Sequence, residues 1–235
     1  MLTTKRFLLP DANLRRYIRN FGNLYIPKDF RVNEPEIIQK IMVEYPLATL
    51  VVPHEKLPII SHIPLLFDKS TNTLRGHAAK ANPLARAQLE SPTPCTAIFH
   101  GPNSYISPSW YATKKEHGKV VPTWNLVVVH IQGNLRFISD RDWLYQNVGE
   151  LSQVHESSIG SDWRIEDAPL SYIDVNLKAI VGLEISIENV EAKFKLSQNR
   201  SLEDRKNVIV QLKQSKKQSD HLTAAWMEST ISKDS

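Results

Sequence analysis

The chain has 235 residues, of which 41% are apolar and 23% are charged, and its formal net charge is +4. This length supports one large globular domain or two small ones. Acidic residues accompany the basic ones nearly everywhere, and no long run of Lys or Arg indicates a basic arm for nucleic acid. No apolar run approaches the roughly 18 residues that a membrane-spanning helix requires.

The cysteine and histidine contents exclude two kinds of site. Cys95 is the only cysteine, so no intramolecular disulfide can form. Its apolar neighbours predict a buried, inert thiol. The eight histidines show no metal-ligand spacing, and we expect no protein-bound metal.

The N-terminal stretch is basic, with five Lys or Arg residues against one acid, Asp11, in residues 1–22. This resembles a weak transit peptide, although serine is absent and Pro10 interrupts it. A short helix from Asp11 to Asn20, or an upstream start codon, are the alternatives. We expect residues 1–23 to be an N-terminal extension and the protein to be cytoplasmic.

The first half of the chain begins with a helix and continues with strands. Asn33 and Glu36 predict a capping box, followed by apolar residues at helical spacing up to Tyr45-Pro46. Apolar runs predict strands at 47–52, 57–67, 74–81, 95–101 and 104–108, with a short helix at 83–90. Pro58 and Pro64 predict an edge or a bulge in the second strand.

The second half contains the longest β run. Residues 120–138 are apolar on both faces in the middle and predict a central strand. Asp140 opens a helix, and residues 169–177 predict a short one. Residues 179–196 predict either a last pair of strands or one long strand. Ser201 and Asp204 predict a capped final helix. From about Lys213 the composition turns polar, which predicts a frayed tail.

The order of these elements predicts a mainly β protein with peripheral helices, of the α+β class. No strand-helix-strand repeat is visible, which favours an antiparallel barrel over a doubly wound sheet. The glycine-rich phosphate loops and the nucleophile elbow are absent. We expect a barrel domain at 24–212 and a polar tail at 213–235.

Two polar interruptions of the strands indicate a phosphate site. His77, Lys80 and Asn82 precede a short helix, and a cation beside free helix N–H groups suits an anion. The alternative is that His77 is a hydrogen-bonded strand residue and Lys80 faces solvent. His62, beside Ser61, is either a hydrogen-bonded core histidine or part of the same site, since we expect 57–67 to pair with 74–81.

Two further clusters suit a planar, anionic ligand. Trp110 and Trp124 stand beside hydroxyl and amide groups, among them Thr123 and Asn125, which suits a flavin as well as ordinary aromatic packing. Residues 193–200 form a dense polar cluster after an apolar strand. This cluster is either a loop end with a helix cap or a lid over an anionic ligand.

Six motifs in this order carry a family resemblance: YIPKDF, HIPLLFD, GHAAKANP, YISPSWY, VPTWN and KLSQN. From Leu24 to Leu212 the chain resembles the PaiB family of FMN-binding negative transcriptional regulators. That family is similar to the flavin-binding split barrels akin to the pyridoxamine-phosphate oxidases, which are homodimers with FMN at the subunit interface. The resemblance implies a six-stranded antiparallel split β-barrel and two FMN sites per dimer.

The resemblance also implies roles for particular residues. The arginine that relatives place on the FMN phosphate falls at Ser61 or His62, so Lys80 is left as the cation. Lys195 and Gln198 match a segment that crosses the subunit interface. Leu126 departs from the family's tyrosine. The cofactor-binding residues expected are Ser61, His62, His77, Lys80, Asn82, Trp110, Thr123, Asn125, Lys195 and Gln198.

Three functions remain open. The first is an FMN-binding regulator whose flavin is a sensor or structural ligand; its link to DNA rests on the resemblance alone, because no helix-turn-helix is evident. The second is an FMN-dependent oxidoreductase or flavin reductase, with Trp110, Tyr111 and His117 admitting substrate. The third is a non-redox module for haem, with His62 or His77 as ligand, or for a pyridoxal-type phosphate.

Overall fold

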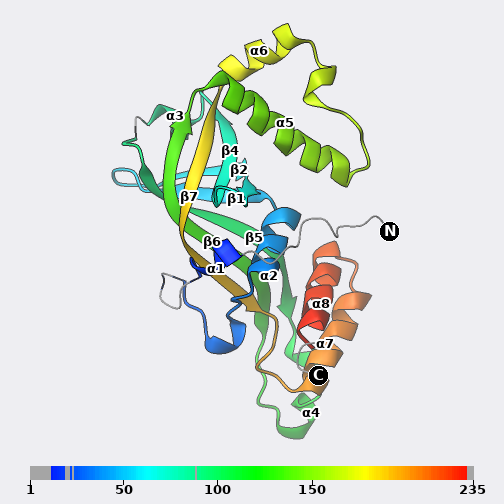
Figure 1. Cartoon of the computed structure of the whole chain (residues 1–235). Coiled ribbons are helices and arrows are strands. Elements are labelled where there is room, and N and C mark those ends of the chain that lie inside the picture. Colours follow the sequence, from blue (N-terminus) through cyan, green and yellow to red (C-terminus); the bar gives the residue numbers. More distant parts are fainter. Residues whose placement is uncertain (1–11, 19–21, 23, 88, 232–235) are drawn as a thin grey trace.

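The computed structural model describes residues 12–18, 22, 24–87 and 89–231. One antiparallel sheet has the strand order β2-β1-β5-β6-β7-β4-β3 (Figure 1). Its strands are β1 (Leu47–Val52), β2 (Ile59–Pro64), β3 (Leu66–Asp68), β4 (Thr73–Ala79), β5 (Thr93–Ile106), β6 (Thr123–Ile138) and β7 (Ile180–Lys195). The sheet with its surrounding helices confirms the mainly β class.

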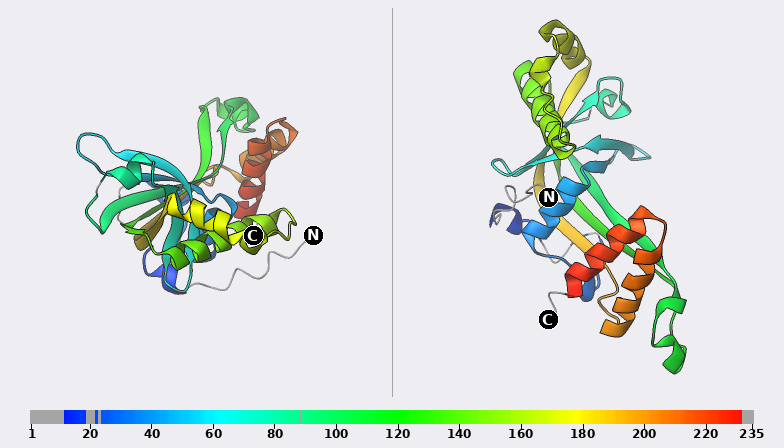
Figure 2. Two further views of the ribbon diagram at one scale, coloured as in Figure 1. Left: turned by 90° about the horizontal axis from the view of Figure 1, so that it is seen from above. Right: turned by 90° about the vertical axis from the view of Figure 1, so that its right-hand side faces the viewer.

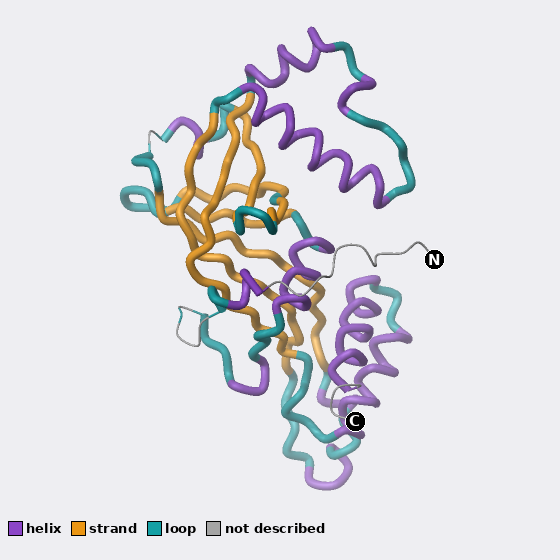
Figure 3. Tube along the Cα trace, in the orientation of Figure 1, coloured by secondary structure: helices purple, strands orange, loops and turns teal. Residues whose placement is uncertain are grey.

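Helices gather at the two ends of the long strands (Figure 3). The α-helices are α1 (Ala12–Arg15), α2 (Pro35–Glu44), α3 (Pro83–Arg86), α4 (Lys114–His117), α5 (Arg141–Ser158), α6 (Leu170–Lys178), α7 (Leu202–Gln214) and α8 (Gln218–Ile231). Short 3-10 turns are η2 (Lys28–Phe30), η3 (Pro108–Trp110) and η4 (Ile165–Asp167). Helices α5 and α6 lie at one end of β7, and α7 and α8 lie at the other (Figure 2).

The sheet curls so that its two edges meet. Edge strands β2 and β3 are consecutive in the chain, with only Leu65 between them. β2 pairs with β1, whereas β3 pairs with β4. The backbone of β4 approaches the end of β2 so closely that a Cβ on Gly76 would lie 2.8 Å from the Pro64 carbonyl oxygen. The segment 59–68 therefore closes the curl.

The structure has seven strands where the family resemblance implied six. The expected strand 57–67 divides at Leu65, where the chain changes partner strand. Pro64 has no backbone N–H to donate to a neighbouring strand, which is consistent with β2 ending at this residue. The two strands expected at 95–101 and 104–108 are instead one strand, β5, with a bulge between His100 and Asn103.

The expected pairing of 57–67 with 74–81 is wrong for most of its length. β4 pairs with β7 along its whole length and with β3 at its start, so Gly76 faces Leu183 and His77 faces Gly182. Each strand instead pairs with its neighbour in the chain, so that β1 and β2 form one hairpin and β3 and β4 form the next. His62 consequently lies opposite Thr49 of β1 and away from His77.

The core lies inside the curl, and β7 shows its alternation. Ile185 and Ile187 are buried while Ser186 and Glu188 are exposed, as the sequence predicted. A bulge between Gln132 and Gly133 shifts the β6–β7 register. A Cβ on Gly133 would collide with the Ser186 carbonyl oxygen, so this position requires glycine.

The described part of the N-terminal extension packs on the sheet. Leu14 of α1 is fully buried in the main core, and Tyr17 accepts a hydrogen bond from the Val190 N–H at 2.9 Å. The expected helix ends earlier than Asn20, since α1 stops at Arg15, and Asp11 and Asn20 lie outside the described residues.

The two predicted N-terminal caps have different outcomes. Helix α2 begins at Pro35, and its N-cap Glu34 makes no side-chain cap bond, so the capping box from Asn33 does not form. Proline fixes the first helical position instead. Ser201 does cap α7, accepting a hydrogen bond from the Asp204 N–H at 3.2 Å.

Asp140 caps α5 as predicted, and its side chain accepts a hydrogen bond from the Trp143 N–H at 2.8 Å. Replacing Asp140 by alanine is expected to lower the free energy of unfolding by about 1 kcal/mol, because the N–H loses its partner. Urea unfolding measures this loss. Asp140→Ser is the control, because serine keeps a capping oxygen. Equal losses in both variants would contradict a capping role.

The C-terminal segment corrects the expectation of a frayed tail. Residues 218–231 form α8, in which Ala224 and Met227 are fully buried and Trp226 is 9% exposed. Helix α8 lies against the lower part of β5, and α7 lies beside α8 (Figure 1). The polar composition of this segment predicted a frayed tail, but α8 needs only one narrow apolar face to pack, and its polar residues lie on the opposite face.

No helix in the described part of the chain is both long enough and apolar enough to cross a membrane.

Candidate functional site

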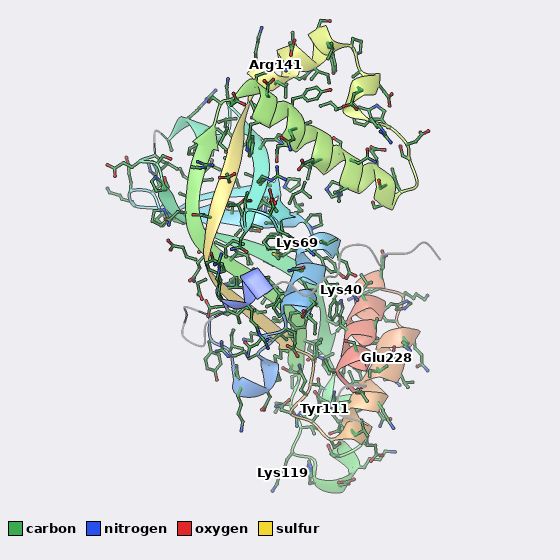
Figure 4. The ribbon with its side chains drawn as sticks, viewed as in Figure 1. Lys40, Lys69, Tyr111, Lys119, Arg141 and Glu228 are labelled. Atoms are coloured by element: carbon green, nitrogen blue, oxygen red, sulfur yellow. The ribbon has the colours of Figure 1, made fainter. Side chains whose placement is uncertain are left out.

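The predicted site residues fall mainly at the two ends of β7. His77 pairs with Gly182 near the start of β7, whereas Lys195 ends the strand. At about 3.3 Å per residue these positions are about 40 Å apart along the strand. In Figure 4, Arg141 marks the first end and Tyr111 the second. One small ligand cannot contact both groups within a single chain.

At the first end, Ser61 and Asn82 bind each other. The Asn82 Oδ1 caps α3 by accepting a hydrogen bond from the Leu84 N–H at 2.9 Å, and it also accepts one from the Ser61 hydroxyl at 3.2 Å. These contacts pin α3 to β2. The Asn82 oxygen is thereby occupied, and its first role is structural.

His77 lies half-buried on β4. Burial lowers the pKa of His77, which favours the neutral imidazole. Its Nδ1 is buried and has no hydrogen-bond partner among the described residues. Opposite it, Gly182 leaves room for the ring of Trp143 from α5. His77 can therefore donate or accept a hydrogen bond, but it supplies no charge near neutral pH.

Lys80 is exposed and points along a hollow of about 350 Å³ between the start of α5 and the end of α6. We call this the Lys80 hollow; it is lined by Lys80, Ser139, Arg141, Leu144, Asp174, Leu177 and Lys178. Arg141 and Lys178 were not among the residues expected from the sequence. The only signal for them was a basic residue at the start of one predicted helix and another just after the end of the next.

At the second end, Asn125 and Gln198 hold the turn after β7. Asn125 is fully buried and exchanges hydrogen bonds with the Ser197 hydroxyl at 3.0 and 3.2 Å. The Gln198 side chain accepts from the Leu196 N–H at 2.7 Å and donates to the Phe194 carbonyl at 2.6 Å. These bonds fix a turn in which Ser197 has φ +66°.

Lys195 lies on the outward face at the end of β7, within reach of Thr123 at the start of β6. The Lys195 ammonium donates a hydrogen bond to the Thr123 hydroxyl. Burial, together with the charges of Lys193 and Arg200, lowers the pKa of Lys195. An anion placed here would relieve the repulsion among these cations.

Trp124 stands on the same face with its ring held in place. Its Nε1 donates to Asn103 at 2.9 Å, and its ring meets that of Tyr105 edge to face at 6.0 Å. The indole is nevertheless 51% exposed. A fixed, exposed aromatic face is suited to contact with a planar ring.

Trp110 lies elsewhere, on η3 against α7. With Tyr111 and Lys115 it lines a second hollow of about 700 Å³. Tyr111 is 2% exposed, and the Arg200 guanidinium lies 4.8 Å from its ring centre. The structure therefore separates Trp110 from Trp124, which the sequence analysis had considered together.

His62 is exposed and lies on the outward face of the edge strand β2. Its Nδ1 lies 3.2 Å from the Thr49 hydroxyl, which is also 3.2 Å from His100 Nε2. No cluster of ligands able to hold a metal ion occurs among the described residues. Cys95 is buried, and burial raises its pKa to about 12, as expected for an inert thiol.

These features define a class of protein. A curled antiparallel sheet that carries a cationic hollow at one end and a fixed aromatic face beside a lysine at the other is suited to a phosphorylated heterocyclic cofactor. Residues 24–189 match the family described as "Putative FMN-binding domain". The chain belongs to this FMN-binding family, and FMN is the cofactor that the family membership assigns.

Individual relatives are similar to this chain over most of its length. The chain is 32% identical over 212 residues to "Protease synthase and sporulation protein PAI 2" of Bacillus subtilis, covering 89% of this chain and 99% of the relative. This match confirms the resemblance to the PaiB family. The chain is also 35% identical over 210 residues to "Uncharacterized protein AN0679" of Emericella nidulans, covering 74% of this chain and 84% of the relative.

A solved structure supports the fold. The FAD and heme binding protein from Mycobacterium smegmatis superposes with a TM-score of 0.53 at 15% identity, covering 70% of this chain and 73% of that one. At this identity the likeness concerns the fold alone.

The residues present fit FMN. Lys80 and its basic neighbours suit the phosphate, and Trp124 with Lys195 suits a flavin ring. The two sets lie at opposite ends of β7.

Proposed function

We propose that this chain is an FMN-binding split-barrel protein of the PaiB type in which two copies share each flavin site. Lys80 from one copy holds the phosphate, and Lys195 and Trp124 from the other contact the ring. The main support for this proposal is that Lys80 and Lys195 lie near opposite ends of β7, about 40 Å apart along the strand within one chain.

A continuous outward sheet face offers a surface for the second copy. The pairing register places Leu47, Ile60, Tyr105, Trp124 and Leu126 on one side of four neighbouring strands. Leu47, Ile60, Tyr105 and Trp124 are 48–59% exposed. These exposed apolar side chains share the face with the polar Thr49, His62 and His100, and they support burial of this face against another copy.

The output we propose is negative regulation of transcription, with the flavin as sensor or structural ligand. The similarity to the sporulation and protease-synthesis protein of Bacillus subtilis supports this role. When bound, FMN supplies a redox centre. The chain's own residues position it: the lysines fix its phosphate and ring, and Trp124 covers the ring from water.

The test is to titrate the purified protein with FMN while measuring its mass by light scattering. We expect one FMN per chain and a particle of twice the 26.8 kDa chain mass. A monomer at micromolar concentration that binds FMN fully would contradict the shared site. Rapid, repeated reduction of the bound flavin by NADH or NADPH would instead favour an oxidoreductase.

A further inference from the structure

A band of histidines crosses the outward face of the sheet. In the pairing register, Thr49 of β1 lies opposite His62 of β2 on one side and opposite Ile98 of β5 on the other. Ile98 in turn lies opposite His130 of β6. His100 points to the same side as Ile98, because alternate residues of a strand share a face. Three histidines from three strands therefore lie in one band, on the face proposed to meet a second copy.

The Thr49 hydroxyl connects two of these histidines. Its oxygen lies 3.2 Å from His62 Nδ1 and 3.2 Å from His100 Nε2. When both rings are neutral, the hydroxyl can donate to one nitrogen and accept from the other, and when both are charged its oxygen can accept from both. Both histidines are exposed, so they exchange protons freely with water while this face is uncovered.

His130 is half-buried at the far side of the band. Burial lowers its pKa; the Glu191 carboxylate, opposite it on β7, acts in the raising direction, and His100 lowers it further. Glu191 is 1% exposed, and it accepts hydrogen bonds from the Leu24 N–H at 3.2 Å and from the Gln132 amide at 3.4 Å. The segment around Leu24 thus covers the β7 end of the band, and the Glu191 carboxylate is engaged there.

The fixed charges on this face are mainly positive. The strand segments that form it contain one carboxylate, Glu191, and two lysines, Lys193 and Lys195; the segments are 47–51, 60–64, 94–105, 124–132 and 189–195. The Lys193 ammonium donates to the Tyr25 carbonyl at 3.0 Å, and the Lys193 backbone bridges to Arg31, a further cation beside β7. Charging the three histidines therefore adds positive charge to a face that has a single carboxylate to offset it.

We propose that the association of two copies through this outward face is linked to proton binding, and that His62, His100 and His130 weaken it when they are charged. This rests on the proposed function, because a second copy must cover the face. Two-fold pairing brings the same surface of both copies together, so charge gained by one band faces charge gained by the other.

The direction of the pH effect follows from desolvation. A covered imidazole favours its neutral form, so two separated chains bind more protons than the associated pair does. Proton uptake on separation means that the pair is tightest above the titration range of histidine and loosens as the pH falls through that range.

Sedimentation of the FMN-saturated protein at two pH values tests this, and it also shows whether separated chains stay compact. Between about pH 7.5 and about pH 5.5, the dimer dissociation constant of the unaltered protein is expected to rise about tenfold or more, since each proton taken up contributes up to about tenfold per pH unit. In the double variant His62→Gln/His100→Gln, the rise is expected to be at least about threefold smaller, because glutamine does not titrate.

The variants decide the result, because a phosphate monoester such as FMN also changes its charge near about pH 6. His155→Gln, on α5, is the matched control and should keep the full rise. A rise that shrinks only in the double variant supports the proton link. An equal dissociation constant at both pH values, or an undiminished rise in the double variant, overturns it and leaves the shared FMN site in place. Separate chains of the unaltered protein at about pH 7.5 overturn the proposed function itself, and the proton link with it.

Discussion

Replacing Trp226 by alanine is expected to lower the free energy of unfolding by about 3–5 kcal/mol. Trp226 is 9% exposed and meets Phe194 of β7 edge to face at 5.4 Å. The Lys40 ammonium of α2 lies 4.8 Å from the centre of its ring. The indole thus joins α8 to both the sheet and α2, and its loss leaves a cavity at that junction.

Urea unfolding followed by circular dichroism measures this effect. Tyr172→Ala is the matched control, because Tyr172 is an aromatic residue on α6 that is 62% exposed. Its loss is expected to cost no more than about 0.5 kcal/mol. A cost below about 1 kcal/mol for Trp226→Ala would contradict the packing of α8 and restore the interpretation of a polar tail.

Lys80→Ala and Lys195→Ala are each expected to weaken FMN binding by about tenfold to a hundredfold, the effect of losing one charge-assisted contact. Lys80 is proposed for the phosphate and Lys195 for the ring, so the two losses act at opposite ends of the ligand. Calorimetric titration with FMN measures both. Lys206→Ala, on α7, is the control and should bind as tightly as the unaltered protein.

These two losses have distinct ligand dependence. The Lys195→Ala variant should also bind riboflavin more weakly than the unaltered protein does. The Lys80→Ala variant should bind riboflavin with the same affinity as the unaltered protein, because riboflavin has no phosphate. If both variants bind FMN normally, neither lysine belongs to the site.

The sequence was sufficient for most individual elements because their signals are local. The cap residues Asp140 and Ser201, and the alternation of Ile185 and Ile187 with exposed neighbours, depend only on nearby positions. Composition also predicted the buried thiol of Cys95. Local rules of this kind survive folding unless tertiary contacts oppose them.

Long-range pairing was the part that the sequence could not supply. Whether 57–67 is one strand or two depends on which strands lie beside it, and these are β1 on one side of Leu65 and β4 on the other. The fate of α8 likewise depends on a sheet surface built by β5 and β7. Neither surface is visible in the local sequence.

The candidate site shows the same division. The motifs singled out Lys80 and Lys195 as candidates for binding the cofactor, and these remain predictions. The structural roles of Ser61, Asn82, Asn125 and Gln198, which bind backbone groups and neighbouring side chains, appeared only in three dimensions. Arg141 and Lys178 carried no motif, because their value comes from meeting Lys80 in space.

Mixing Lys80→Ala with Lys195→Ala tests the shared FMN site most directly. The two variants are co-expressed with different tags, and they pair at random. Each mixed dimer then has one site with both lysines and one site with neither. The account predicts that about a quarter of all sites regain the affinity of the unaltered protein. If mixed dimers form and no high-affinity site appears, Lys80 and Lys195 do not contact the same FMN from different copies, and the account is wrong.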